Sequence, residues 1–172
     1  MAWRARARDE LAQRQDRHRI TAFLDCSTCY ERVAHHTSRQ AAVDAGLPPA
    51  IANLVWDLYG GPRRIRVHGA VGCEHRPISG LVAGCPVAKD ILDAYLGPLA
   101  RVTETKAKVR QYVDDVMVRV EDETPLQAAA TTMSSEMNAV KAALRNQGMT
   151  LNDTKEQLLI ATAAGRKAWQ QA

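Results

Sequence analysis

The sequence predicts an α+β protein with an antiparallel sheet and helices packed on one face of that sheet. Short apolar segments with strand character occur at 20–25, 107–121 and 156–161, and the longer segments between them have helical patterns. Glycine and proline residues separate these segments. The expected order is strand, helices, hairpin, helix, hairpin, helix and strand, without an internal repeat.

The first strand, ITAFLD at 20–25, is apolar and ends on Asp25. A helix is expected at 36–45, because the sequence GLPP that follows stops the helical pattern. A second helix is expected at 49–59, where it ends before a Gly-Gly-Pro breaker. This second helix carries four apolar residues at helical spacing, Ile51, Leu54, Val55 and Leu58.

Residues 63–76 are predicted to form a hairpin with its turn near Gly69. In its first strand apolar residues alternate with basic ones, so one face of the hairpin is basic and carries Arg64, Arg66 and His68. The glycine-bounded segment SGLVAGCP follows, and a helix is expected at 87–101.

Residues 107–121 are predicted to form two strands that meet at Asp114 and Asp115. The second of these strands alternates valine with other residues, which is the period of a strand with one buried face. An Ala-rich helix is expected at 125–146, with Gly148 as its C-terminal cap. EQLLIA at 156–161 is predicted to form the last strand.

The length of 172 residues suits one domain with its own core. No apolar run approaches the ~18 residues of a membrane span, and the N-terminus lacks the apolar region of a secretory signal. We therefore expect an intracellular protein, in the nucleus or the cytoplasm, without a membrane partner. We divide the chain into a basic segment at 1–19, a folded domain at 20–162 and a tail at 163–172.

The net charge of +4 is concentrated at the N-terminus. Residues 1–20 hold six arginines and three acids, a net charge of +3, so the remaining residues add only +1. A basic segment of this kind suits a polyanionic partner, and the alternative is a solvated helix face.

Cys26 and Cys29 form a CxxC pair, which is found in redox motifs and in zinc sites. A thiol or zinc protein is therefore one alternative function. It requires that these two sulfurs lie together, exposed and near Cys73 or Cys85.

Asp114 and Asp115 lie where two strands turn back on each other, and Asp is common in turns for structural reasons alone. The functional interpretation is that adjacent carboxylates repel each other and that a divalent cation removes this penalty. Asp25 ends a separate apolar strand, so the fold could bring it to the same place. Three such acids could bind two cations, one at an attacking 3′-hydroxyl and one at a leaving pyrophosphate. We expect the three carboxylates to converge within reach of one cation.

The segments around these acids resemble the palm motifs of reverse transcriptases, particularly those of non-LTR retroelements and group II introns. FLDCSTCYERV resembles the first motif, SGLVAGCP the glycine-rich second motif, and QYVDDVMV the YxDD motif. GMTLNDTKEQLL is similar to the motif that follows YxDD. All four occur in the family's order, and the resemblance as a whole covers roughly residues 18–162.

The resemblance implies an antiparallel palm sheet and an RNA-directed DNA polymerase that transfers dNTPs to a primer 3′-hydroxyl on an RNA or DNA template. It implies Asp25, Asp114 and Asp115 as catalytic ligands of two Mg²⁺ ions, with Mn²⁺ as an alternative metal. The implied nucleotide-binding residues are Tyr30, Gly84 and Lys155. Tyr30 would exclude a 2′-hydroxyl, and Lys155 would offer a cation near the departing pyrophosphate; a core aromatic and a solvated lysine are the structural alternatives.

Some residues depart from the family pattern. Ala83 replaces a usual glutamine, Glu31 replaces a usual aspartate, and Ala88 and Lys89 replace a small polar residue and a proline. Few residues precede the first motif or follow the last, so we expect a palm without fingers and thumb, which a larger polyprotein with a nuclease could supply. The second alternative is thus a degenerate retroelement fragment that folds and binds nucleic acid through 4–19 and 63–66 without polymerising.

Overall fold

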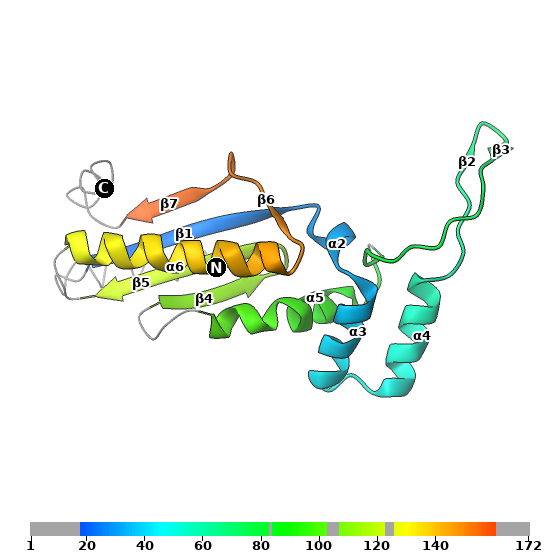
Figure 1. The fold of residues 1–172 in the computed structure, drawn as a ribbon, viewed down its shortest axis with the longest axis horizontal. Coiled ribbons are helices and arrows are strands. Elements are labelled where there is room, and N and C mark those ends of the chain that lie inside the picture. The colour runs from blue at the N-terminus through cyan, green and yellow to red at the C-terminus, as the bar shows by residue number, and fades with distance from the viewer. Residues whose placement is uncertain (1–17, 83, 103–106, 123–125, 161–172) are drawn as a thin grey trace. The chain divides into compact units, whose positions relative to one another are not determined.

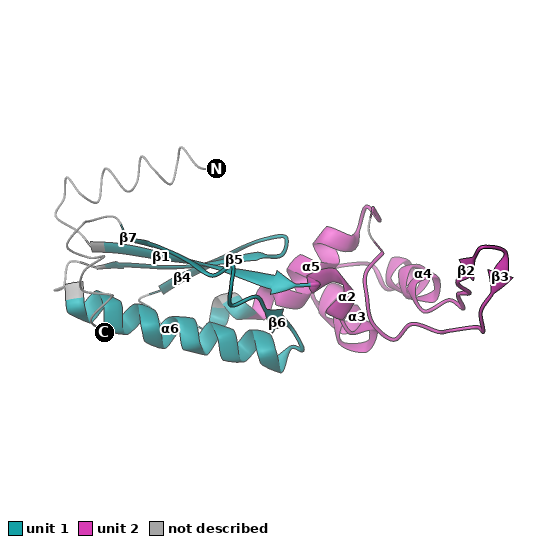
Figure 2. Ribbon diagram, turned by 90° about the horizontal axis from the view of Figure 1, so that it is seen from above, with its two compact units in different colours: residues 1–27, 99–172 teal, residues 28–98 magenta. Residues whose placement is uncertain are grey.

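The computed structural model describes residues 18–82, 84–102, 107–122 and 126–160 (Figure 1). Ala83, most of the basic segment at 1–19 and the tail at 163–172 therefore lie outside the described residues. The chain divides into two compact units, Met1–Ser27 with Leu99–Ala172, and Thr28–Pro98 (Figure 2).

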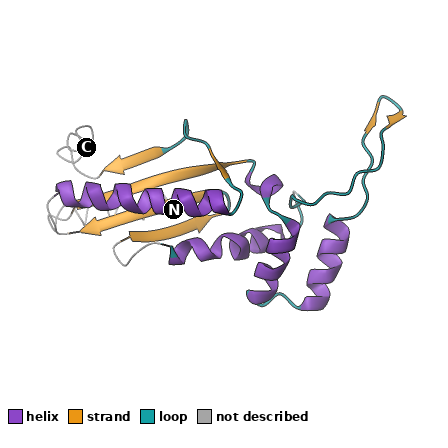
Figure 3. Cartoon of the chain, viewed as in Figure 1, coloured by secondary structure: helices purple, strands orange, loops and turns teal. Residues whose placement is uncertain are grey.

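The first unit is built on a five-stranded sheet, and its antiparallel pairing is the one that the sequence predicts (Figure 3). Strand β1 lies at its centre, with β5 along one side of it and β4 beyond β5. The short strands β6 and β7 share the other side of β1. The strands are β1 (His18–Ser27), β4 (Ala107–Tyr112), β5 (Asp115–Asp122), β6 (Thr150–Leu151) and β7 (Gln157–Ile160).

Alternate residues of β1 and β5 form the buried face of this sheet. Ala22 lies opposite Val118 and Leu24 lies opposite Val116, and all four side chains are fully or almost fully buried. Because side chains alternate along a strand, Asp25 and Asp115 belong to the opposite face. The strand register thus separates the core from the acids.

Helix α6 (Leu126–Asn146) packs along the sheet, against β1, β4, β5 and β6 (Figure 2). Its buried side includes Met133, Val140 and Leu144, whereas Ser135 on another side is exposed. Gly148 ends the helical turn at a φ of 81°, and the amide of Met149 donates to the carbonyl of Leu144 at 3.0 Å. The amphipathic helix thus covers the apolar face of the sheet, which confirms the predicted fold class.

The second unit consists of four helices and a small hairpin. Helix α3 packs against both α4 and α5, while α5 ends at Leu96 because Gly97 and Pro98 follow it. Residues 97–101 continue as a 3-10 turn, so the helix predicted at 87–101 is shorter than expected. The elements are α2 (Cys29–Arg32), α3 (His35–Asp44), α4 (Pro49–Tyr59), β2 (Arg66–Val67), β3 (Ala70–Val71) and α5 (Ala88–Leu96).

No helix within the described ranges combines the length and the apolar character needed to span a bilayer.

Candidate active site

Asp25 and Asp115 lie directly opposite each other in the antiparallel pairing of β1 with β5. Side chains at directly opposite positions project from the same face of a sheet, with Cβ atoms about 4.5–5.5 Å apart. Residues far apart in sequence are thus brought together by strand register. The pairing places two of the three predicted carboxylates on the face that α6 does not cover.

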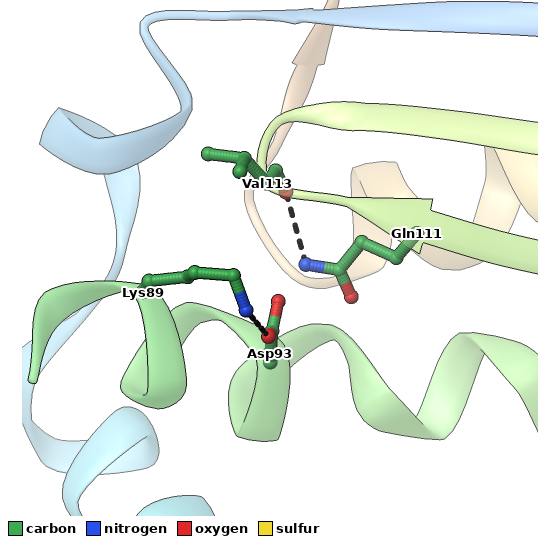
Figure 4. Close-up of polar contacts among 4 residues, drawn as sticks. All are labelled: Lys89, Asp93, Gln111 and Val113. Atoms are coloured by element: carbon green, nitrogen blue, oxygen red, sulfur yellow. Dashed lines mark hydrogen bonds and ion pairs between the residues drawn. The ribbon is translucent and has the colours of Figure 1, made fainter. Parts of the chain in front are cut away.

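Asp114 lies in the tight turn that joins β4 to β5, where Tyr112 pairs with Asp115. The other turn residue, Val113, has a φ of 59°, which is rare for a β-branched residue. The side-chain amide of Gln111 donates to the carbonyl of Val113 at 3.0 Å and braces the turn (Figure 4). A non-glycine residue held at positive φ stores backbone strain, as functional sites often do.

Lys155 reaches Asp25 from the loop between β6 and β7. Its Nζ lies 3.4 Å from Asp25 Oδ2, and the backbone amide of Asn152 donates to the carbonyl of Asp25 at 2.9 Å. Strand β7 pairs with β1 as far as Phe23, and β6 resumes the pairing at Cys26. The loop therefore leaves the sheet beside Asp25, and this departure allows Lys155 to approach the carboxylate.

The pKa of Asp115 is raised above its usual value. Partial burial is the largest cause, followed by the negative charges of Asp114 and Asp25, while Lys155 acts in the opposite direction. The three acids therefore act on one another electrostatically, as expected of carboxylates gathered for a cation.

The donor set of this cluster suits Mg²⁺, which prefers hard oxygen ligands and usually takes one or two carboxylates together with phosphates and water. Asp25 is engaged with Lys155, however, and among the described residues no three His, Cys, Asp or Glu side chains are arranged to hold an ion. The structure brings the acids to one end of the sheet without forming the ligand geometry predicted from the sequence.

Tyr30 and the glycine-rich segment are brought together in the second unit. The carbonyl of Tyr30 accepts a hydrogen bond from the amide of Leu81, and the carbonyl of Val33 accepts one from the amide of Gly80, both at 2.9 Å. Gly80 and Gly84 have φ values of 98° and 81°. Glycine adopts positive φ values without steric cost, which explains why glycine occupies both positions. The first and second predicted motifs are thus neighbours.

His35 and Tyr59 support this segment and were not predicted to do so. The ring of His35 donates from Nε2 to the carbonyl of Gly80 at 2.8 Å, and lies 6.1 Å from the ring of Tyr59. Tyr59 is fully buried, and burial, with a contribution from Cys85, raises the pKa of its hydroxyl well above the usual value. No sequence signal pointed to either residue, because both contacts join segments far apart in the chain.

Lys89 departs from the expected motif pattern and lies on the exposed side of α5. Its Nζ forms an ion pair with Asp93 at 2.5 Å, one helical turn away (Figure 4). The hydrogen bond and charge of Asp93 raise the pKa of Lys89. Exposed pairs of this spacing contribute little to stability, so Lys89 is accounted for as a surface residue.

A family model described as "Reverse transcriptase (RNA-dependent DNA polymerase)" matches residues 3–170 of the chain. The chain belongs to the reverse transcriptase family. None of the curated proteins compared with it matches. Similar solved structures include telomerase from Candida tropicalis, with which the chain shares the fold.

Three of these telomerase structures match with similar scores. The form truncated from its C-terminal domain has a TM-score of 0.61 at 12% identity, covering 89% of this chain and 33% of that chain. The form in complex with a TWJ fragment of telomeric RNA has a TM-score of 0.60 at 13% identity, and the match covers 91% of this chain and 28% of that chain. The apo form also has a TM-score of 0.60 at 13% identity, and the match covers 91% of this chain and 30% of that chain. The chain thus spans a third or less of these telomerases.

The burial of the CxxC cysteines contradicts the thiol alternative. Cys26 and Cys29 are each 3% exposed, whereas reactive cysteines need a partly exposed environment. Cys29 instead serves as a small buried side chain at the start of α2. The reverse transcriptase motifs therefore account for this segment better than thiol chemistry does.

We expect Asp115→Asn to stabilise the first unit at neutral pH. A carboxyl group whose pKa is raised by folding favours the folded state only at low pH, and this contribution is lost as pH rises from about 4 through the folded pKa. Solvent screens this largely exposed site, so the gain at pH 7 is a few tenths of a kcal/mol, at most about 1 kcal/mol.

Urea unfolding of Asp115→Asn and of the wild type at pH 4 and pH 7 measures this effect. The gain should appear at pH 7 and shrink at pH 4. The exposed Asp153→Asn, in the loop after β6, serves as the charge-matched control. Equal stability of Asp115→Asn and the wild type at pH 7 would show that the acids do not repel one another in the folded protein.

Proposed function

We propose that this chain carries the nucleotidyl-transfer site of an RNA-directed DNA polymerase. The observation that carries the proposal is the direct pairing of Asp25 with Asp115, next to a turn that holds Asp114. These residues come from two of the family's motifs, and Asp25 and Asp115 lie on the face of the sheet opposite to α6. The family match supports the reaction class.

The proposed metal ligands are Asp25, Asp114 and Asp115, with two Mg²⁺ ions or, alternatively, Mn²⁺. Such ions, when bound, supply charge stabilisation to the attacking and leaving oxygens of an in-line displacement. The protein's part is to hold the carboxylates on rigid strands at the sheet end. The brace from Gln111 to Val113 serves the same purpose, because it fixes the turn that carries Asp114.

Tyr30, Gly84 and Lys155 are the proposed nucleotide-binding residues. Lys155 offers an ammonium group close to the acids, with a side chain that is 64% exposed and therefore accessible to a triphosphate. Tyr30 lies beside the glycine-rich segment through its hydrogen bond with Leu81, which supports a common role of the two motifs at the sugar of a dNTP.

The proposed partners are an RNA or DNA template with its primer, dNTPs, and fingers, thumb or nuclease regions of a larger polyprotein. The description of the family as an RNA-dependent DNA polymerase supports an RNA template. The motif sequences support a retrotransposon or group II intron type of enzyme. The alternative of a folded but inactive fragment is not favoured, because the family model spans nearly the whole chain and the acids are in register.

Primer extension tests this function. Purified protein is incubated with an RNA template, an annealed DNA primer, dNTPs and Mg²⁺, and extended products are resolved by length. We expect extension that depends on both template and Mg²⁺. Absence of extension, under conditions in which the protein is folded and binds the primer and template, would contradict the proposal.

We expect Lys155→Ala to slow nucleotide addition by about 10- to 100-fold. Removing one positioned donor from a developing charge costs about 10²–10³-fold at a shielded site, and the exposure of Lys155 reduces this. Single-turnover rates at saturating dNTP measure the change, with Lys155→Arg expected to recover most of the loss. Lys108→Ala, an exposed lysine on β4, is the control. A wild-type rate of nucleotide addition in Lys155→Ala would contradict a role of Lys155 in nucleotide binding and leave it as a surface lysine.

A further inference from the structure

The hairpin at residues 63–76, here called the basic hairpin, projects from the end of α4 in the second unit (Figure 1). All fourteen of its residues are exposed. Its two-residue turn is formed by His68 and Gly69, whose φ values of 47° and 88° suit the turn type that matches the twist of paired strands. An isolated two-stranded hairpin is marginally stable in water. Contacts with the rest of the second unit are therefore needed to hold this hairpin in one conformation.

The base of the hairpin is tied to the helical part of the unit. Arg63 and His75 exchange two backbone hydrogen bonds of 2.8 Å, and the guanidinium of Arg63 donates to the carbonyl of Tyr59 at 3.1 Å. Tyr59 is itself fully buried in α4. The strands are therefore presented from a fixed base, while both of their faces remain open to solvent.

The charge of the basic hairpin is strongly one-sided. It contains four arginines and one acid, Glu74, which gives a net charge of +3 with histidines neutral. The whole chain has a net charge of +4. Arg64 and Arg66 are two residues apart on one arm of the hairpin, with Arg66 in β2. A short, exposed element with this charge complements a polyanion.

The single acid compensates this charge only weakly. Glu74 lies 3.6 Å from Arg64 and 3.8 Å from Arg76, beyond hydrogen-bonding distance in both cases. All three side chains are at least 44% exposed, and exposed pairs of this kind are worth about 0–1 kcal/mol. The Arg66 side chain forms no ion pair or hydrogen bond with any other described residue; only its backbone pairs, with Val71 of β3. The arginines are thus available to phosphate groups.

We propose that the basic hairpin binds the phosphate backbone of the single-stranded RNA template. The choice of RNA rests on the proposed function, whereas the choice of a phosphate backbone rests on the charge and exposure of the hairpin. Its guanidinium groups form bidentate hydrogen bonds with phosphate oxygens. The same arm of the hairpin carries the exposed Ile65 and Val67, which offer apolar contacts that salt does not screen.

Fluorescence anisotropy with a labelled 20-nucleotide RNA, in EDTA and without dNTP, tests this proposal independently of catalysis. Each phosphate contact to a single strand contributes about 0.7 to the slope of log Kd against log salt concentration. The double variant Arg64→Gln with Arg66→Gln should therefore lower the slope by about 1.4 and weaken binding about tenfold at 0.15 M salt. Glu74→Gln should have the opposite effect on affinity, because it removes the competing carboxylate.

Arg101→Gln with Arg145→Gln is the matched control, since both residues are exposed and lie outside the hairpin. The RNA affinity and the salt slope of this control should stay close to those of the wild type.

An equal loss of RNA affinity in the control, or unchanged RNA binding by the hairpin variant, would overturn the proposal. Unchanged RNA binding by the hairpin variant would leave a protein partner as the ligand of the hairpin. A parallel loss with DNA of the same sequence agrees with backbone contacts, whereas a loss with DNA alone would overturn the assignment to the RNA template. If extension fails but these losses appear, only the polymerase function is contradicted.

Discussion

Asp114→Asn is expected to reduce primer extension by about 10³-fold while the protein stays folded. Asparagine has almost the same shape as aspartate but lacks its charge, so it is a poor ligand for a hard divalent cation. The loss corresponds to about 4 kcal/mol of transition-state stabilisation, which is in the range of several kcal/mol that a catalytic cation supplies. Single-turnover extension with Mg²⁺ measures the effect.

Asp114 is well placed for this test because it lies in a turn and outside the buried face of the sheet. Its replacement should leave the thermal unfolding temperature almost unchanged. Asp153→Asn removes one exposed acid from the loop after β6 and should extend primers at the wild-type rate. A rate for Asp114→Asn within about twofold of wild type would contradict its role as a metal ligand.

Leu144→Ala is expected to destabilise the first unit by about 2–5 kcal/mol. Leu144 is fully buried in the last part of α6, the helix that covers the apolar face of the sheet. Truncation of a buried leucine removes its transfer free energy and leaves a cavity, and such changes cost about 2–5 kcal/mol. This is a large fraction of the typical stability of a domain, about 5–15 kcal/mol.

Native-state hydrogen exchange of β1 and β5 amides reports the stability of the first unit by itself. Leu144→Ala should lower the protection of these amides from hydrogen exchange. The same variant should also extend primers less at moderate temperature. Ser135→Ala, on an exposed side of the same helix, is the control and should change protection little. Unchanged protection in Leu144→Ala would show that α6 does not stabilise the sheet.

Much of the fold follows from local patterns in the sequence. The helix predicted at 49–59 matches α4, and the helix predicted at 125–146 differs from α6 by one residue at its start. Helix α2 and strand β6 were not predicted, because four and two residues are too few to show a period. In α4 the spacing predicts a helix, yet Leu54 and Leu58 are 67% and 68% exposed. Periodicity identifies the helix but does not determine which side becomes buried.

The sequence singled out the acids of the candidate site, and the structure brings Asp25 and Asp115 into register, while their role as metal ligands stays a prediction. The sequence identified Asp25 and Asp115 as strand-end acids, whereas their register depends on long-range pairing, and a shift by one residue would move a side chain to the other face. The ion pair of Lys155 with Asp25 arises where the pairing of β1 passes from β7 to β6. Such contacts depend on tertiary structure, which no local pattern encodes.

Anomalous diffraction from crystals of the protein with Mn²⁺ and a dNTP tests the cation site most directly. We predict an anomalous peak bound by carboxylate oxygens of Asp25 and of at least one of Asp114 and Asp115, at about 2.0–2.3 Å. Asp25 would then have exchanged its contact with Lys155 for the cation. A peak only at other side chains, or no peak at Mn²⁺ concentrations that support primer extension, would contradict the assignment of these three aspartates.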